Sequence, residues 1–191
     1  MAISLRNLTN RMIDHIDAVA SRGQALRLPS SLLSKKISLT QQTEEDIAFL
    51  RRLYLLVRRE EMAATGWNEA QITVFLEGQF TAQYRHYALH YADAFYSIIR
   101  HGDEPIGRLA LFSNNGDIRI VDIALLPEWR SRGIGTDLIQ AIFAQARETS
   151  QTVSIHVEQF NPAQTLYNRL GFRKCGENGP YWLMEWRQEN G

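Results

Sequence analysis

Apolar residues recur along the chain at two spacings, one typical of helices and the other typical of strands. Ile47, Leu50, Leu53 and Val57 are separated by three or four positions, so they would share one face of a helix over residues 44–58. The same criterion predicts helices over residues 5–19, from about residue 68 onward, over residues 135–147 and over residues 162–170.

Short runs rich in branched and aromatic residues, bounded by turn-forming residues, predict strands. His101–Pro105 would join the strands Phe95–Arg100 and Ile106–Phe112 into a hairpin, and the turn Asn114–Asp117 precedes a strand at Ile118–Leu125. Because strands alternate with helices, we expect an α/β fold with a central mixed β-sheet flanked by helices. Further strands are predicted over residues 37–40, 152–157 and 181–186.

The length of 191 residues is typical of one domain with a sizeable core. We interpret residues 1–36 as an N-terminal helical extension and linker, and residues 37–191 as the domain that carries the function. Leu28–Ser34 is assigned to the linker because it contains Pro29 and three serines. The predicted helix over residues 5–19 would dock on the domain or on a second copy of it, so a homodimer stays open.

Composition and charge narrow the classes of partner. Hydrophobic residues make up 45% and charged residues 22%, which is near the average for globular proteins, and the formal net charge is zero. Cys175 is the only cysteine, which rules out an internal disulfide and a cysteine-based zinc site. We therefore expect a cytoplasmic protein that needs no metal and binds neither nucleic acid nor a membrane. The excess of basic over acidic residues within residues 1–36 leaves an organellar presequence as the alternative.

The segment Val121–Gln140 carries the most informative motif, in which a buried strand runs into a glycine turn that opens a helix. Gly133 and Gly135 would let the backbone approach a phosphate, and free amides at a helix start point at an anion. Arg130 and Arg132 add positive charge beside this turn. Alone, the motif is also typical of a plain sharp turn. The chain has no Gly-Lys-Ser or Gly-Lys-Thr and lacks the third glycine of a dinucleotide fingerprint, so those two phosphate sites are excluded.

Together with a second motif, this turn resembles the GNAT acyltransferase superfamily. Arg130, Gly133 and Gly135 match the family signature of Arg or Gln, two residues, Gly, one residue, and Gly or Ala. Asn161–Ala163 followed by Leu166–Phe172 is similar to that family's closing element. The resemblance implies an acyl-CoA N-acyltransferase fold. It also implies transfer of an acetyl group from acetyl-CoA to a primary amine, by direct attack in a ternary complex.

The resemblance further implies where acetyl-CoA binds. The cofactor would lie where the parallel strands Ile118–Leu125 and Thr152–Val157 splay apart, and backbone groups of Leu125 and Leu126 would pair with the pantetheine arm. Asn161 would help to anchor that arm. The pyrophosphate would be held by the amides of Arg132, Gly133, Ile134, Gly135 and Thr136, with the Arg130 and Arg132 side chains nearby.

By the same resemblance, Tyr167 is the general acid that protonates the departing thiolate, and the amide of Leu125 stabilises the oxyanion. The alternative for Tyr167 is an aromatic residue that packs on the sheet. In some relatives a Glu or His on this strand acts as the general base. The corresponding positions here hold Arg119 and Val121, and neither accepts a proton at neutral pH. This departure leaves the general base open.

Asp122 is one candidate base, although period-two alternation would point it away from Arg119, Val121 and Ile123, and a structural carboxylate is the alternative. Water could relay the proton. Other candidates are Glu60, Glu61 and Glu158, with surface solvation as the alternative. His156 is in a predicted core strand close to the proposed cleft, where a hydrogen-bonded histidine is commoner than a catalytic one.

His86 and His90 have the spacing of two metal ligands on a helix, but without a recognisable third ligand we interpret them as surface or packing residues. A small-molecule amine is expected as acceptor. A CoA-binding regulatory module without turnover and a protein-modifying acetyltransferase remain the alternatives. Aromatic residues between the first helix and the hairpin would form the core and part of an acceptor wall: Tyr54, Trp67, Phe75, Phe80, Tyr84, Tyr87, Tyr91 and Phe95.

Overall fold

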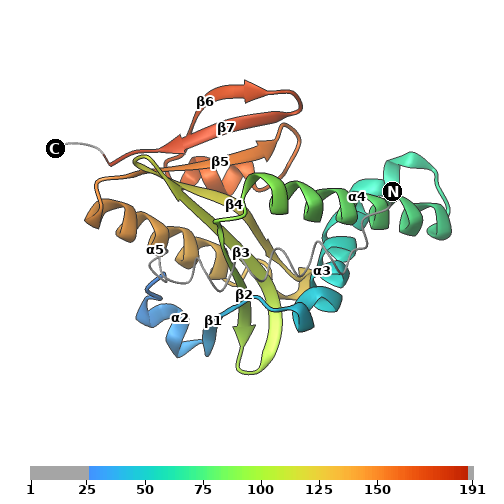
Figure 1. Cartoon of the computed structure of the whole chain (residues 1–191), viewed down its shortest axis with the longest axis horizontal. Coiled ribbons are helices and arrows are strands. Elements are labelled where there is room, and N and C mark those ends of the chain that lie inside the picture. Colours follow the sequence, from blue (N-terminus) through green and yellow to red (C-terminus); the bar gives the residue numbers. More distant parts are fainter. Residues whose placement is uncertain (1–25, 189–191) are drawn as a thin grey trace.

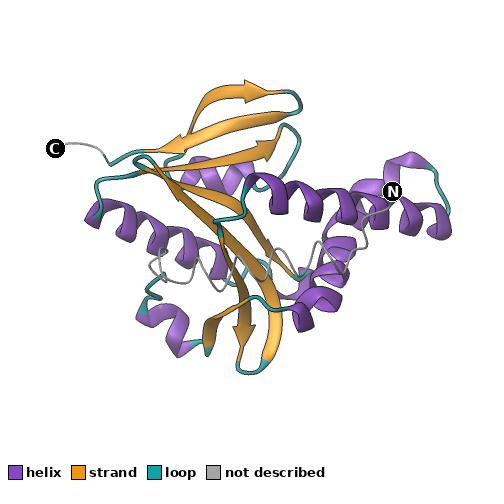
Figure 2. Ribbon diagram, in the orientation of Figure 1, coloured by secondary structure: helices purple, strands orange, loops and turns teal. Residues whose placement is uncertain are grey.

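A seven-stranded sheet with helices on both faces forms the centre of the computed structural model, which describes residues 26–188 (Figures 1 and 2). The strand order is β1-β2-β3-β4-β5-β7-β6, and every neighbouring pair is antiparallel except β4 and β5. This architecture confirms the predicted α/β class with a mixed sheet. The strands are β1 (Ile37–Gln41), β2 (Phe95–His101), β3 (Glu104–Asn114), β4 (Asp117–Leu125), β5 (Thr152–Glu158), β6 (Arg173–Asn178) and β7 (Tyr181–Trp186).

Two hydrophobic clusters attach the helices to opposite faces of the sheet. One cluster joins α5 and α6 to the sheet and includes Leu138, Ile142 and Tyr167. The other joins α3 and α4 to the sheet and includes Leu50 and Tyr84. Figure 1 shows α2 and α5 on one side of the sheet and α3 and α4 on the other. The helices are α2 (Ser30–Ser34), α3 (Ile47–Arg59), α4 (Glu69–His90), α5 (Ile134–Glu148) and α6 (Gln164–Arg169).

The starts of the two helices on the α3 and α4 face are fixed by local capping. The Asn68 side chain accepts from the amide of Gln71, and the Gln71 side chain accepts in return from the amide of Asn68. Thr43 and Asp46 form the same reciprocal arrangement before α3. Such a capping box satisfies amides that have no partner within the helix, so both helix starts could be predicted from sequence.

The structure corrects the predicted linker at Leu28–Ser34, because α2 forms within it. Leu32 of α2 has no exposed surface, and Leu26 and Leu32 belong to the same core cluster as α5. Apolar contact with a distant helix therefore orders a segment whose proline and serines suggested a linker. The predicted helix over residues 5–19 lies outside the described residues, and the division of the chain at residue 36 stays a prediction.

Strand β6 was not predicted, because its residues are mostly exposed and lack an apolar alternation. It pairs with β7 at the edge of the sheet. Between residues 26 and 188, no helix has both the length and the apolar character that a membrane crossing requires.

Candidate active site

Strands β4 and β5 separate partway along their length, and the site is built around this opening. Their parallel pairing runs only from Asp117 opposite Thr152 to Ile120 opposite Ile155. Beyond it, β4 continues to Leu125 while β5 pairs only with β7. A sheet that opens between two parallel strands exposes main-chain groups to a ligand.

Past the end of β4, the glycine turn leads into α5. Gly133 is the N-cap of α5 with φ of +79°, a conformation that side chains with a Cβ rarely adopt, and no side chain caps the helix start. The first amides of a helix have no intrahelical partner, so those of Ile134, Gly135 and Thr136 are free for an anion. The predicted glycine turn at a helix start is therefore present, and the binding of a phosphate by it stays a prediction.

Basic side chains surround this turn, and one comes from outside the predicted motif. Lys35, just after α2, lies 3.1 Å from Asp137 in α5 and donates to the carbonyl of Arg132 at 3.3 Å. The Arg132 guanidinium lies 4.7 Å from the centre of the Trp129 ring. Arg130 turns back and donates from Nε to the carbonyl of Leu125 at 3.2 Å. The segment that precedes β1 therefore contributes a cation next to the turn.

The structure distinguishes between the two residues predicted to pair with a pantetheine arm. The Leu126 amide donates to the Ile106 carbonyl at 2.9 Å, and the Leu126 carbonyl accepts from the Trp129 amide at 2.9 Å. Because backbone groups alternate in direction along a strand, the Leu125 amide points away from β3 and toward the opening. The predicted pantetheine pairing and the predicted oxyanion contact therefore rest on Leu125.

Asn161 lies between β5 and α6, where its side-chain oxygen accepts from the Ala163 amide at 2.9 Å. This bond shapes the start of α6, and Asn161 also lines the cleft described next. A structural role is therefore shown for this residue, and its predicted contact with pantetheine stays a prediction.

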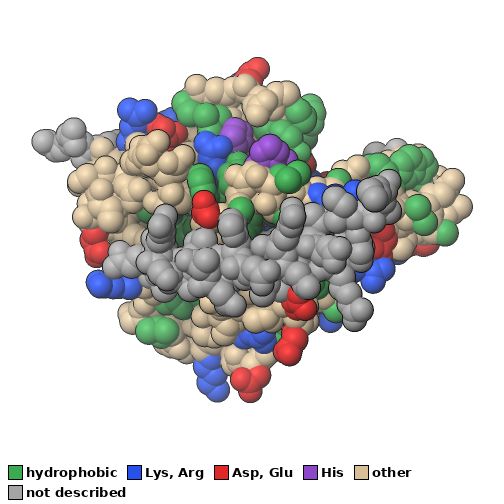
Figure 3. All heavy atoms as spheres, viewed as in Figure 1, with side chains coloured by type: hydrophobic (Ala, Val, Ile, Leu, Met, Phe, Trp, Pro, Cys, Tyr) green, Lys and Arg blue, Asp and Glu red, His purple; other side chains and the backbone are tan. Residues whose placement is uncertain are grey.

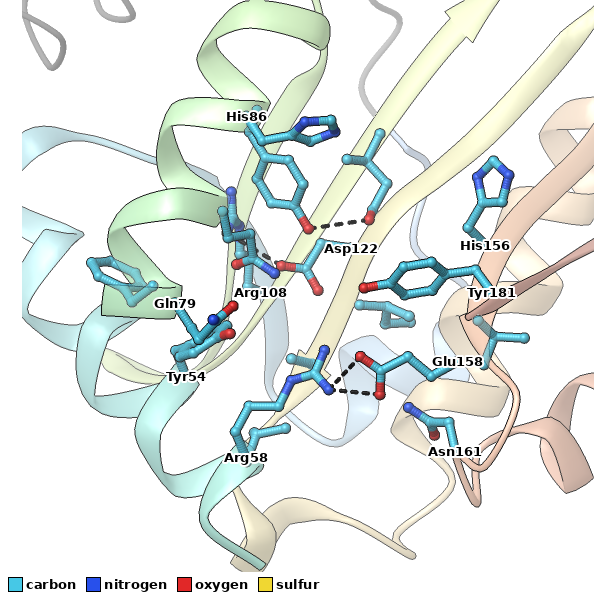
Figure 4. Close-up of a pocket in the computed structure, with 18 of the residues that line it drawn as sticks. Tyr54, Arg58, Gln79, His86, Arg108, Asp122, His156, Glu158, Asn161 and Tyr181 are labelled. Carbon is cyan, nitrogen blue, oxygen red and sulfur yellow. Dashed lines mark hydrogen bonds and ion pairs between the residues drawn. The ribbon is translucent and has the colours of Figure 1, made fainter. Parts of the chain in front are cut away.

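A cleft of about 960 Å³ lies on the α3 and α4 face of the sheet and reaches the opening between β4 and β5. In Figure 4, Tyr54, Arg58 and Gln79 face it from the helices, and His156 and Glu158 face it from the opposite side. The glycine turn does not line this cleft. The molecule thus offers two distinct sites beside the splayed strands, namely the glycine turn at the start of α5 and this cleft. The volume of the cleft is typical of a small-molecule pocket.

A β-bulge changes the direction of Asp122. The register with β3 shifts so that Ala110 faces Asp122 while Leu111 faces Ile120, which leaves Val121 as the extra residue. Val121 and Asp122 consequently both face the α3 and α4 side, where Asp122 lines the cleft. The prediction that Asp122 points away from Val121 and Arg119 was wrong, because strict alternation fails at a bulge.

Asp122 forms an ion pair with Arg108 of β3, which the sequence reasoning missed. Nη1 of Arg108 lies 3.2 Å from Oδ2 of Asp122, and the Arg108 side chain is only 4% exposed. Burial raises the pKa of Asp122, and the charges of Arg108 and Arg58 oppose this rise. An arginine inside the otherwise apolar strand Ile106–Phe112 was the available signal, since arginine is almost never fully buried without a partner.

Tyr167 of α6 lines the cleft where it meets the opening. Its ring packs edge-on against Phe172 at 5.7 Å between ring centres, so it also serves the core. Burial raises the pKa of Tyr167, and the nearby charge of Asp122 raises it further. The phenol therefore keeps its proton at neutral pH, as a general acid requires.

His156 of β5 faces the cleft beside Arg119 of β4. Arg119 Nη1 lies 3.3 Å from Nδ1 of His156, and Nε of Arg119 donates to Ser154 at 3.3 Å. Burial lowers the pKa of His156, and the positive charge of Arg119 lowers it further. Because Arg119 has only donors, Nδ1 must accept and Nε2 must carry the proton. His156 is therefore a neutral donor toward the cleft rather than a base.

An ion cluster joins α3 to β5 across the cleft. Arg58 Nη1 donates to both carboxylate oxygens of Glu158 at 2.7 and 2.8 Å, and it also pairs with Glu61 at 2.9 Å. Burial lowers the pKa of Arg58, but these two carboxylates outweigh burial and raise it. Glu61 and Glu158, both considered as bases, are therefore held by one guanidinium. Glu60 is exposed and does not line the cleft.

His86 and His90 line the cleft with tilted rings whose centres are 4.5 Å apart. Figure 3 shows histidine side chains beside a basic side chain between α4 and the β5 side of the sheet. Within the described part of the chain, no three His, Cys, Asp or Glu side chains gather as a metal site requires. Of the predicted aromatic residues, the cleft is lined by Tyr54, Phe75, Phe80, Tyr87 and Tyr91, whereas Trp67, Tyr84 and Phe95 lie elsewhere.

A mixed sheet that opens between two parallel strands, next to a glycine turn at a helix start, defines the acyl-CoA N-acyltransferase fold. The PaiA N-acetyltransferase from Thermoplasma acidophilum, solved in complex with coenzyme A, matches with a TM-score of 0.61 and 15% identity, over 80% of this chain and 99% of that one. An acetyltransferase from Thermus thermophilus matches with a TM-score of 0.55 and 18% identity, over 78% and 95%. A GNAT family acetyltransferase from Elizabethkingia anophelis with acetyl-CoA bound matches with a TM-score of 0.50 and 18% identity, over 80% and 99%. These likenesses show the fold.

The family is shown by sequence. A family model described as the Acetyltransferase (GNAT) family matches residues 48–172, which is more than half of the chain. The chain belongs to this family, and membership implies acyltransferase activity. The matched region contains β4, the glycine turn and α6, which carry the predicted motifs.

Proposed function

We propose that this protein is an N-acetyltransferase that moves the acetyl group of acetyl-CoA to a primary amine of a small molecule, by direct attack in a ternary complex. The observation that carries the proposal is the meeting of two sites at the splayed strands. One is a helix start without a side-chain cap, and the other is a cleft on the opposite face. A ternary complex requires two such sites that share one reaction point.

The residues of the glycine turn fit the phosphates of coenzyme A. The start of α5 offers free amides, Gly133 holds the left-handed conformation, and Lys35, Arg130 and Arg132 supply positive charge. The cofactor contributes an activated acetyl thioester. In this proposal the Leu125 amide holds the thioester oxygen and stabilises its developing negative charge.

In this proposal Tyr167, which lines the cleft with a protonated phenol, donates that proton to the departing thiolate. Asp122 takes the proton of the attacking amine. Burial raises the pKa of Asp122, which makes it a stronger base than an ordinary carboxylate. His156 is excluded by the hydrogen bond at Nδ1. Arg58 contacts both carboxylate oxygens of Glu158, whereas the ion pair with Arg108 uses only Oδ2 of Asp122.

Release of free thiol from acetyl-CoA tests the proposal when the full chain is incubated with a panel of small primary amines. We expect amine-dependent thiol release and binding of CoA by calorimetry. If CoA binds but no amine or protein lysine is acetylated, the chain is a regulatory module. If only protein lysines react, it modifies proteins. Absence of CoA binding would contradict both the proposed reaction and the proposed cofactor site.

A further inference from the structure

Charge is unevenly distributed along the cleft, and the part lined by β3 and β4 is positive. Arg108 of β3 and Arg119 of β4 lie there with a single carboxylate, that of Asp122. At the open end the balance is reversed, since one guanidinium, that of Arg58, faces the two carboxylates of Glu61 and Glu158. A ligand with its own separated charges would match this arrangement.

Arg108 has one edge without a partner. Nη1 is used by Asp122, but Nε and Nη2 are buried and find no hydrogen-bond acceptor among residues 26–188. The rings of Tyr87 and Tyr96 lie 5.1 and 5.2 Å from the guanidinium carbon and provide no acceptor for these two atoms. Leaving buried N–H groups unpaired is costly, and more so on a charged group. This edge of Arg108 is therefore available to an acceptor other than the described side chains.

The chemistry of this edge selects a carboxylate. Nε and Nη2 present two parallel N–H bonds in one plane, which match the two oxygens of a carboxylate. Arg119 adds positive charge, because its described hydrogen bonds go to Ser154 and His156 and none of them to a carboxylate. A second anion beside Asp122 is thus compensated by two guanidinium groups.

We propose that the acceptor amine carries a carboxylate, as an amino acid does, and that the Nε–Nη2 edge of Arg108 binds this group. The inference rests on the proposed acetyl transfer and names its substrate class. Asp122 lies against the opposite end of the same guanidinium, so an amine beside Asp122 and a carboxylate on the free edge are close enough to belong to one small molecule. Because both unpaired atoms are buried, the proposal requires side chains around Arg108 to move when the ligand binds.

The test measures binding to the full chain saturated with CoA, a dead-end complex in which no transfer occurs. Standard amino acids are compared by calorimetry with their primary amides, which keep the amine and the side chain but lose the carboxylate charge. We expect at least one acid to bind about tenfold more tightly than its amide, the difference that a charge-assisted bidentate contact provides. Equal affinity of acid and amide, or binding of neither, overturns the proposal.

Variants locate the contact. Arg108→Met should remove the preference for the acid, and Arg119→Met should reduce it. Arg100→Met is the matched control, because Arg100 also loses an ion pair, with Asp46 at 3.0 Å, but lies outside the cleft. It should keep the preference. If Arg108→Met does not fold, the acid–amide comparison and Arg119→Met still decide. An unchanged preference in folded Arg108→Met or in Arg119→Met overturns the assignment.

The binding of CoA distinguishes a failure of the proposed function from a failure of the proposed substrate class. If calorimetry shows no binding of CoA to the unmodified protein, the proposed function itself fails. If CoA binds and simple amines without a carboxylate are acetylated as well as amino acids, the proposed function stands and only the substrate class is wrong.

Discussion

At the scale of single residues, burial determines the chemistry of the candidate site. Tyr167 and Asp122 both have raised pKa values for the same reason, namely that burial disfavours their charged forms. The phenol therefore keeps its proton, and the carboxylate gains affinity for one. The two groups also influence each other electrostatically, since the charge of Asp122 raises the pKa of Tyr167.

Tyr167→Phe removes only the hydroxyl group and should lower kcat about a hundredfold, because the thiolate then departs without a general acid. The affinity for CoA should stay the same. Steady-state thiol release measures the first effect and calorimetry the second. Tyr84→Phe is the matched control, since Tyr84 is also buried but does not line the cleft, and it should leave kcat unchanged. An unaltered rate in Tyr167→Phe would remove this residue as the acid.

Gly133→Ala should weaken CoA binding and lower stability by about 1–2 kcal/mol, because φ of +79° is strained for a residue with a Cβ. Gly179→Ala provides the comparison, as Gly179 has φ of +58° in open space between β6 and β7. It should lose similar stability and keep its CoA affinity. Thermal unfolding and calorimetry give both values. Equal CoA affinity in the two variants would contradict a phosphate site at the turn.

At the scale of elements, sequence predicted those whose signals are local. Helix α4 has both an apolar spacing and a capping box at Asn68, and α5 follows the glycine turn. Helix α2 was missed because contact with the distant helix α5 orders it, and strand β6 was missed because its mostly exposed residues lack an apolar alternation. The bulge at Val121 was missed because it exists only relative to β3.

Leu32→Ala tests whether α2 is an integral part of the fold. Leu32 has no exposed surface, so its truncation should lower the free energy of unfolding by about 2–5 kcal/mol. Leu33→Ala removes the same atoms from a side chain that is 59% exposed and should change stability by about 0.5 kcal/mol or less. Chemical denaturation measures both. Similar values for the two variants would show that α2 contributes little to the core.

At the scale of the whole molecule, the opening of the sheet brings the functional groups together. The ion pair between β3 and β4 and Tyr167 of α6 line one cleft, which lies where β4 and β5 separate after Ile120. Histidine and arginine groups from both strands also face each other across this opening. The electrostatics of the cleft are therefore a property of the assembled sheet.

The lowered pKa of His156, beside this opening, predicts that stability depends on pH. Because burial and Arg119 lower the pKa of His156, the unfolded chain binds a proton at this residue before the folded protein does. The free energy of unfolding should therefore fall as the pH drops below about 6.5, the usual pKa of histidine. Scanning calorimetry between pH 7 and pH 5 should show a steeper loss of Tm for the unmodified protein than for His156→Gln. Parallel curves would contradict the lowered pKa.

The sequence alone determined the α/β class, most element positions and the glycine turn at a helix start, because each depends on spacing between residues that are near in the chain. It also predicted Tyr167, which the fold places at the junction of the two sites. Only the tertiary structure decided that Asp122 faces the cleft, that Arg108 pairs with it and that Lys35 reaches the turn. These contacts join strands and helices that are separate in the chain. No local sequence pattern specifies the register and packing that bring them together.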